Sequence, residues 1–129
     1  MVFVLKYRKN LISTQVFEFM KEILNGIKER YFLNFYAIGS DGDHLHVLVE
    51  ASPQYSPSRI MQICKSIMAI QIFKKFPELK EELLGGEFWS DGGHIDTVGD
   101  CYDVKAMEQY IKNQGVNKNQ LTLYQFTSP

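Results

Sequence analysis

The chain has 129 residues, of which 45% are hydrophobic and 13% aromatic, which predicts one globular domain over residues 1–129 and excludes a disordered chain. The 14 basic and 15 acidic residues give a formal net charge of −1, so net charge does not favour a nucleic-acid partner. No apolar run is long enough to span a membrane, the start lacks a signal-peptide pattern and the two cysteines form no C-x-x-C pair. We therefore expect a cytoplasmic protein without a membrane partner.

The first half of the chain predicts one helix among three strands. A short apolar run predicts a strand near residues 2–8. Apolar residues then recur at intervals of three and four over 14–30, which predicts an amphipathic helix. An aromatic-rich run predicts a second strand at 31–39, and the glycine-containing turn at 40–43 predicts a hairpin with a third strand at about 43–51.

The second half predicts a helix at 57–75, begun after a proline-bracketed loop, and then an acidic excursion or short helix at 78–86. Residues 87–99 predict the last strand of the sheet, with a glycine-rich interruption. A final helix is expected at about 103–114, and a short tail follows with one further strand at 121–126.

The element order β-α-β-β-α-β predicts an α+β protein of the ferredoxin-like class, an antiparallel sheet with helices on one face. The last predicted helix is additional to that arrangement. We therefore expect a core at about 2–99, the extra helix at 103–114 and a short tail, all within one domain.

Two histidines occur on the third predicted strand. Alternation places His44 and His46 on one face and the apolar residues Leu45, Val47 and Val49 on the other, which faces the core. The two imidazoles would stand about 7 Å apart, at about 3.3 Å per residue. This spacing suits two ligands of one metal ion, although a pair of surface histidines has the same pattern.

Tyr110 and Gln114 lie one turn apart on the last predicted helix and share a face. A tyrosine hydroxyl has an ordinary pKa of about 10, so as a nucleophile it needs a divalent ion that polarises a phosphate. Two imidazoles with the amide oxygen of Gln114 would suit Mg²⁺ or Mn²⁺. Tyr110 also fits a purely structural role in helix packing, and Gln114 fits an exposed surface position. His94 is expected in a loop or at a sheet edge, where it could touch substrate.

Four segments carry a resemblance to a known family. His44-Leu45-His46 resembles the His-hydrophobe-His motif of HUH endonucleases, and the run from Tyr110 to Gln114 resembles the tyrosine helix of TnpA-type, single-tyrosine, IS200-like transposases of small bacterial and archaeal insertion sequences. Residues 3–8 resemble that family's first strand, and residues 89–99 its last strand and linker. The similarity covers nearly the whole chain, with the segments in the family's order.

The resemblance implies a DNA transposase with a specific mechanism. Tyr110 would attack a phosphodiester of single-stranded DNA, forming a 5′-phosphotyrosine link and a free 3′-OH. The ion, Mg²⁺ or Mn²⁺, would be held by His44, His46 and Gln114. Attack by a 3′-OH would rejoin strands, and no nucleotide cofactor is implied because the covalent link conserves the energy of the broken bond.

The resemblance also implies a homodimer in which the tyrosine helix of one subunit completes the histidine site of the other. Gly99 before that helix and Gly115 after it are the expected hinges. The implied substrates are DNA hairpins at the ends of the mobile element.

Four basic residues are the expected DNA contacts: Lys6, Arg8, Lys9 and Lys65. A second hypothesis is a non-cutting, domesticated nucleic-acid-binding regulator on the same fold, which would not need the full set of histidines, tyrosine and glutamine. A third hypothesis, a small-molecule-binding ferredoxin-like dimer, explains neither the two histidines nor the pair Tyr110 and Gln114.

Overall fold

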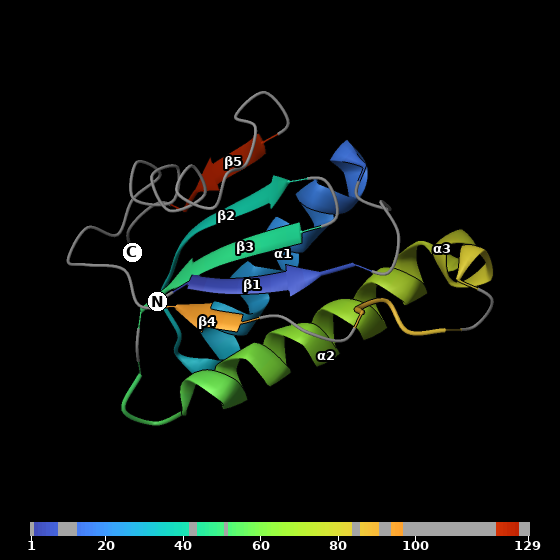
Figure 1. Ribbon diagram of the computed structural model, residues 1–129. Helices are drawn as coiled ribbons and strands as arrows, with labels where there is room; N and C mark the ends of the chain where they lie inside the picture. Colours follow the sequence, from blue (N-terminus) through green and yellow to red (C-terminus); the bar gives the residue numbers. More distant parts are fainter. Residues whose placement is uncertain are drawn as a thin grey trace.

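The computed structural model describes residues 2–7, 13–41, 44–50, 52–83, 86–90, 94–96 and 121–126. Figure 1 shows their arrangement as one sheet with helices packed against it. The elements in chain order are β1 (Val2–Lys6), α1 (Thr14–Tyr31), β2 (Phe35–Asp41), β3 (His44–Val49), α2 (Pro57–Lys75), α3 (Pro77–Glu82), β4 (His94–Asp96) and β5 (Leu121–Gln125). The predicted helix at 103–114 lies outside the described residues.

The five strands form one sheet in the order β4-β1-β3-β2-β5, and every neighbouring pair is antiparallel. The first four strands follow the ferredoxin-like order, so the predicted α+β class is confirmed. The strand predicted in the tail is confirmed as β5, which pairs with β2 and extends that side of the sheet. The histidine strand β3 is thus the centre of the sheet, with two strands on each side.

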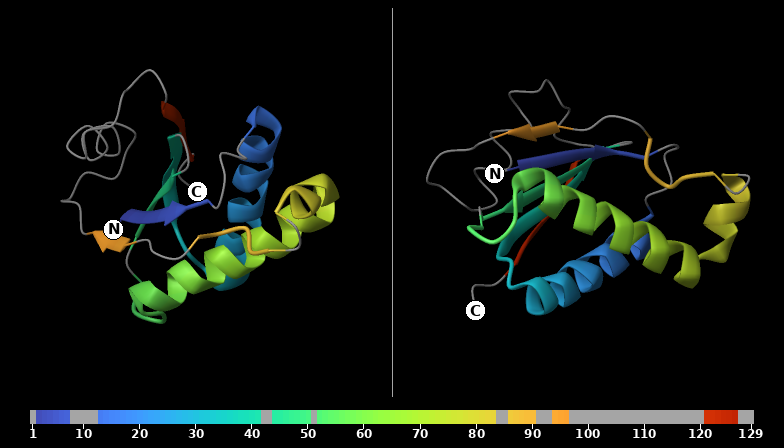
Figure 2. Two further views of the ribbon diagram at one scale, coloured as in Figure 1. Left: turned by 45° about the vertical axis from the view of Figure 1, so that its right-hand side comes forward. Right: turned by 90° about the horizontal axis from the view of Figure 1, so that it is seen from below.

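The two long helices lie on the same face of the sheet, as both views in Figure 2 show. Each begins at a serine whose hydroxyl accepts a hydrogen bond from a backbone N–H of the first turn: Ser13 from Val16 at 3.2 Å and Ser56 from Arg59 at 3.1 Å. Such caps satisfy amide groups that have no partner within the helix. The predicted helices at 14–30 and 57–75 are confirmed, the first with one more residue.

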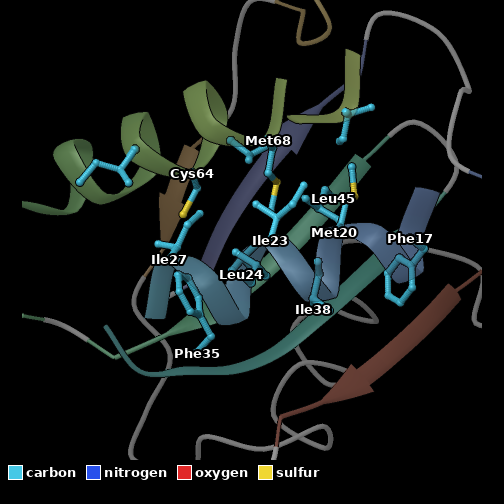
Figure 3. Close-up of a cluster of buried hydrophobic side chains, with 14 of the residues drawn as sticks. Phe17, Met20, Ile23, Leu24, Ile27, Phe35, Ile38, Leu45, Cys64 and Met68 are labelled. Atoms are coloured by element: carbon cyan, nitrogen blue, oxygen red, sulfur yellow. The ribbon is translucent and has the colours of Figure 1, made fainter. Parts of the chain in front are cut away.

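The core fills the space between the helices and the sheet (Figure 3). Met20 and Leu24 of α1 meet Leu45 of β3 and Met68 of α2, and all four side chains are fully buried. Burying a side chain of this size stabilises a fold by about 1.5–3 kcal/mol. The apolar face of β3 is therefore anchored, and the alternation of the strand then determines where its histidines point.

Two predicted boundaries were wrong. The second strand begins at Phe35 and not at residue 31, because α1 continues to Tyr31, whose ring packs edge-on against Tyr55 at 6.1 Å. Phe32 then ends the helix in the left-handed region, with a φ of 56°. The last strand predicted at 87–99 does not begin at residue 87: among its described residues, Trp89 forms only an isolated bridge to Tyr7, and His94–Asp96 form β4.

The short-helix alternative for 78–86 is the correct one, because α3 occupies Pro77–Glu82 and begins with a proline in its first turn. Among the helices that the structure describes, none combines the length and hydrophobicity needed to cross a membrane.

Candidate active site

The candidate site is built on the face of β3 that points away from α1 and α2. Leu45, Val47 and Val49 are fully buried in the main core, which confirms the predicted apolar face of the strand. Because side chains alternate along a strand, His44 and His46 lie on the opposite face. Their position on the central strand holds both backbones in place through pairing on either side.

The two imidazoles stand side by side, with ring centroids 6.4 Å apart and ring planes 31° from parallel, close to the predicted 7 Å. His44 is half-buried, whereas His46 is 3% exposed. The alternative of a surface histidine pair is therefore wrong, since one ring is almost fully enclosed.

The chemistry of this donor pair suits a divalent ion, since imidazole nitrogens bind such metals at about 2.1 Å. A ring centroid then lies roughly 3.2 Å from the ion, so centroids 6.4 Å apart could share an ion only in a nearly linear arrangement. The two rings would have to come closer together to act as neighbouring ligands of one ion. Their role as metal ligands stays a prediction.

The part of the histidine face around His46 is buried. His46 is opposite Val4 of β1 and Gly39 of β2, so its partner on the β2 side carries no side chain. Val4 and Leu48 on this face are buried, yet they lie outside the main core cluster. Exclusion of water from this face strengthens electrostatic interactions at the histidines.

His94 is the first residue of β4, an edge strand, as one of the predictions for it stated. It pairs with Val4, which in turn pairs with His46, so the three occupy one row across the sheet. At about 4.8 Å between neighbouring strands, the backbones of His94 and His46 are about 10 Å apart.

The remaining predicted site residues, Tyr110, Gln114, Gly99 and Gly115, lie outside the described residues. Within the described ranges, no group of three or more His, Cys, Asp or Glu side chains is arranged to hold a metal ion. The structure therefore places the two histidines, while their metal-binding role, the third ligand and the nucleophile all stay predictions.

Two of the four predicted DNA contacts can be placed. Lys6 is exposed at the end of β1, opposite His44 in the β1–β3 pairing. Lys65 is half-buried on α2, in the helical layer, and its carbonyl accepts a hydrogen bond from the Trp89 indole at 3.0 Å. Arg8 and Lys9 lie outside the described residues, so the structure brings Lys6, but not Lys65, next to a histidine.

Two other reactive groups are ruled out as nucleophiles by burial. Loss of solvation raises the pKa of the Tyr7 hydroxyl far above its ordinary value, although a hydrogen bond with Ser40 acts in the opposite sense. Loss of solvation also raises the pKa of the Cys64 thiol to about 12, which confirms Cys64 as a core residue. Both groups stay protonated at neutral pH.

Sequence reasoning missed how Trp89 is held. Its ring stacks on Tyr7 at 5.2 Å, and its indole N–H reaches α2, so it joins the edge of the sheet to the helical layer. The available signal was a single tryptophan, whose ring and N–H favour a site with both an apolar contact and a hydrogen-bond acceptor.

Comparison with known proteins decides the family. The family model described as "Transposase IS200 like" matches residues 1–114, which include both histidines, Tyr110 and Gln114. The chain belongs to the IS200-like transposase family. The match ends before β5, so that strand lies beyond the family region.

Relatives of this transposase are similar over most of their length. It is 29% identical over 114 residues to the ISDra2 transposase TnpA of Deinococcus radiodurans, covering 88% of this chain and 81% of that one. It is 29% identical over 113 residues to the transposase for insertion sequence element IS200 of Salmonella typhimurium, covering 88% and 73%. A crystal structure of a protein assigned as a transposase from Deinococcus radiodurans R1 superposes with a TM-score of 0.67 at 29% identity, covering 88% of each chain.

Proposed function

We propose that this transposase cleaves and rejoins single-stranded DNA at the ends of its insertion sequence through a 5′-phosphotyrosine intermediate. The observation that carries the proposal is the pair of imidazoles 6.4 Å apart on the central strand, one of them enclosed. A protein that only binds DNA has no need of two adjacent metal-ligating side chains in a water-poor site. Membership of the transposase family supports the same reading.

The covalent step uses Tyr110 as the nucleophile. Its hydroxyl oxygen bonds to phosphorus and gives up its proton, while the bond from phosphorus to the 3′ oxygen breaks and that oxygen leaves as a 3′-OH after gaining a proton. In the rejoining step a 3′-OH attacks the phosphotyrosine, and the tyrosine hydroxyl is released. One phosphodiester is broken and one is formed, so the reaction needs no nucleotide cofactor.

His44, His46 and Gln114 would hold a divalent ion, Mg²⁺ or Mn²⁺. When bound, that ion supplies positive charge that polarises the scissile phosphate. Pairing of β3 on both sides keeps the backbones of both histidines in place. Binding of the protein to Mn²⁺, measured by calorimetry, is expected to weaken strongly in His44→Ala.

The proposal includes a homodimer in which Tyr110 and Gln114 of one subunit complete the histidine site of the other, with Gly99 and Gly115 as hinges. DNA hairpins at the element ends are the proposed substrates, and Lys6, Arg8 and Lys9 the proposed phosphate contacts. Lys6 supports this assignment because it is exposed and lies opposite His44.

The deciding experiment incubates the protein and Mn²⁺ with labelled single strands taken from the DNA that flanks its gene. We expect a covalent protein–DNA adduct that survives denaturation, and no adduct with Tyr110→Phe. DNA binding without any adduct across these strands would favour the non-cutting regulator instead. If the protein neither binds these strands nor forms an adduct with them, both readings are contradicted.

The shared site has its own test. Tyr110→Phe protomers mixed with His44→Ala protomers should recover part of the adduct, because each mixed dimer then contains one intact combination of tyrosine and histidines. Recovery that never exceeds the sum of the separate variants, with heterodimers confirmed by mass spectrometry, would indicate a site built within one chain.

A further inference from the structure

A groove of about 600 Å³ lies between α2 and residues 86–90. Figure 1 shows the course of the chain from α3 back toward β4, which includes this stretch. It is on the helical side of the molecule, away from the histidine face. Its described polar and charged side chains come from α2, α3 and the 86–90 stretch: Ser58, Gln62, Lys65, Ser66, Lys80, Glu87 and Ser90.

The wall formed by residues 86–90 makes contacts with both α2 and the sheet. The Trp89 indole donates a hydrogen bond to the Lys65 carbonyl of α2 at 3.0 Å. Phe88 packs edge-on against Phe73 of α2 at 5.7 Å and against Tyr7 of β1 at 5.6 Å. Because the wall is attached to both the helix and the sheet, the groove exists before any ligand arrives, which reduces the entropy lost on binding.

The chemistry of the groove fits a chain of alternating phosphates and flat apolar groups. Two lysines, Lys65 and Lys80, are among the residues that line the groove, whose only described carboxylate is Glu87. The neutral hydroxyl and amide groups can donate hydrogen bonds to phosphate oxygens, and the side chains of Met61 and Phe73 offer apolar surface for bases. Single-stranded DNA combines these properties, whereas an acidic peptide would leave the apolar surface unused.

One end of the groove reaches the strand beside the histidines. The backbone N–H of Ser90 and its hydroxyl both donate to the Lys6 carbonyl, at 2.9 and 3.2 Å. Lys6 pairs with His44 of β3, so only one strand separates this end of the groove from the candidate site. DNA lying in the groove would therefore meet the Lys6 end of β1, the strand next to the histidine strand.

We propose that this groove binds the single-stranded segment that flanks the cleaved phosphate, with Lys65 and Lys80 contacting its phosphates. The proposal rests on the proposed function and assigns it a second DNA-binding surface, on the opposite layer from the chemistry. Lys65, expected from sequence to contact DNA, thereby acquires a role although it lies away from the histidines.

The test measures fluorescence anisotropy of labelled oligothymidylate with the full-length protein over a series of salt concentrations. The variant is Lys65→Gln/Lys80→Gln, and the matched control is Lys28→Gln/Lys74→Gln, which removes equal charge outside the groove. Loss of two phosphate contacts should weaken binding about tenfold and reduce the slope of log K against log salt by about 1.4, since each single-strand contact contributes about 0.7. The control should retain the wild-type slope.

Equal slopes for the two double variants, with unchanged thermal melting, would overturn the proposal. So would lysine-dependent binding of oligoglutamate together with no lysine dependence for oligothymidylate. If an adduct forms at Tyr110 but binding does not depend on the two lysines, the groove proposal is refuted and the proposed cleavage mechanism stands. Lysine-dependent binding without any adduct refutes the cleavage mechanism while the groove remains a DNA site.

Discussion

Replacing Trp89 with phenylalanine tests whether residues 86–90 are attached to α2 as the structure indicates. The substitution removes the indole N–H that donates to the Lys65 carbonyl at 3.0 Å, and it keeps an aromatic ring against Tyr7 and Phe88. A hydrogen bond of this kind contributes about 1 kcal/mol. The smaller ring leaves unfilled space in a side chain position that is 5% exposed, at a cost of about 1 kcal/mol more.

We therefore expect Trp89→Phe to lower the free energy of unfolding by about 2 kcal/mol, or the melting temperature by about 8 °C in a chain of this length. Trp89→Leu also removes the stacked and edge-on ring contacts, which adds about 2 kcal/mol. Urea unfolding followed by far-UV circular dichroism measures both. In the control Ser90→Ala, the backbone N–H of Ser90 still bonds to Lys6, so a change below about 0.5 kcal/mol is expected.

A Trp89→Phe variant as stable as the wild type would refute the reasoning, because the bond to α2 would then contribute nothing. Equal losses in Trp89→Phe and Trp89→Leu would show that the ring contacts are unimportant. If the wall of the groove depends on this bond, Trp89→Phe should also bind oligothymidylate more weakly.

Three further predictions use other parts of the chain. Burial raises the pKa of Cys64 to about 12 in the folded protein, whereas an unfolded thiol has a pKa of about 8.5, so the unfolded chain releases this proton first as pH rises. The free energy of unfolding should therefore fall by about 1.4 kcal/mol per pH unit above about 8.5. Urea titrations at several pH values measure this slope, and Cys64→Ala should lack the part of it that comes from the thiol. Phe32→Gly should raise stability by about 0.5–1 kcal/mol in thermal melts, since Phe32 adopts a φ of 56° and its side chain is 81% exposed; a loss of stability would show that its ring makes important contacts. Gly39→Val places a branched side chain opposite His46 and should weaken Mn²⁺ binding about tenfold by calorimetry, whereas unchanged affinity would argue against the two histidines as the metal site.

Local patterns determined the helices and the faces of the histidine strand. The apolar repeat of α1 and the serines at both helix starts act within one or two turns, so they are visible in sequence. The same holds for His44 and His46, whose common face follows from the two-residue period of a strand. The predicted start of β2 was too early because α1 extends to Tyr31, whose ring makes a tertiary contact with Tyr55.

The catalytic assignment of Tyr110 and Gln114 came from sequence resemblance, and the family match covers both residues, but they lie outside the described ranges. Their chemistry could be predicted because an i, i+4 pair is local. Placing them beside the histidines would require a long-range contact, which no periodicity encodes.

The sequence by itself thus determined which segments are helices and strands, which face of β3 carries the histidines and which family the motifs resemble. Only the tertiary structure decided what lies beside them: Lys6 opposite His44, the enclosure of His46, and the groove between Trp89 and α2. Ser90 bonds to Lys6 across 84 positions of sequence, and such contacts depend on how strands pair and layers pack. Local residue patterns do not specify those choices, because many pairings bury the same apolar faces.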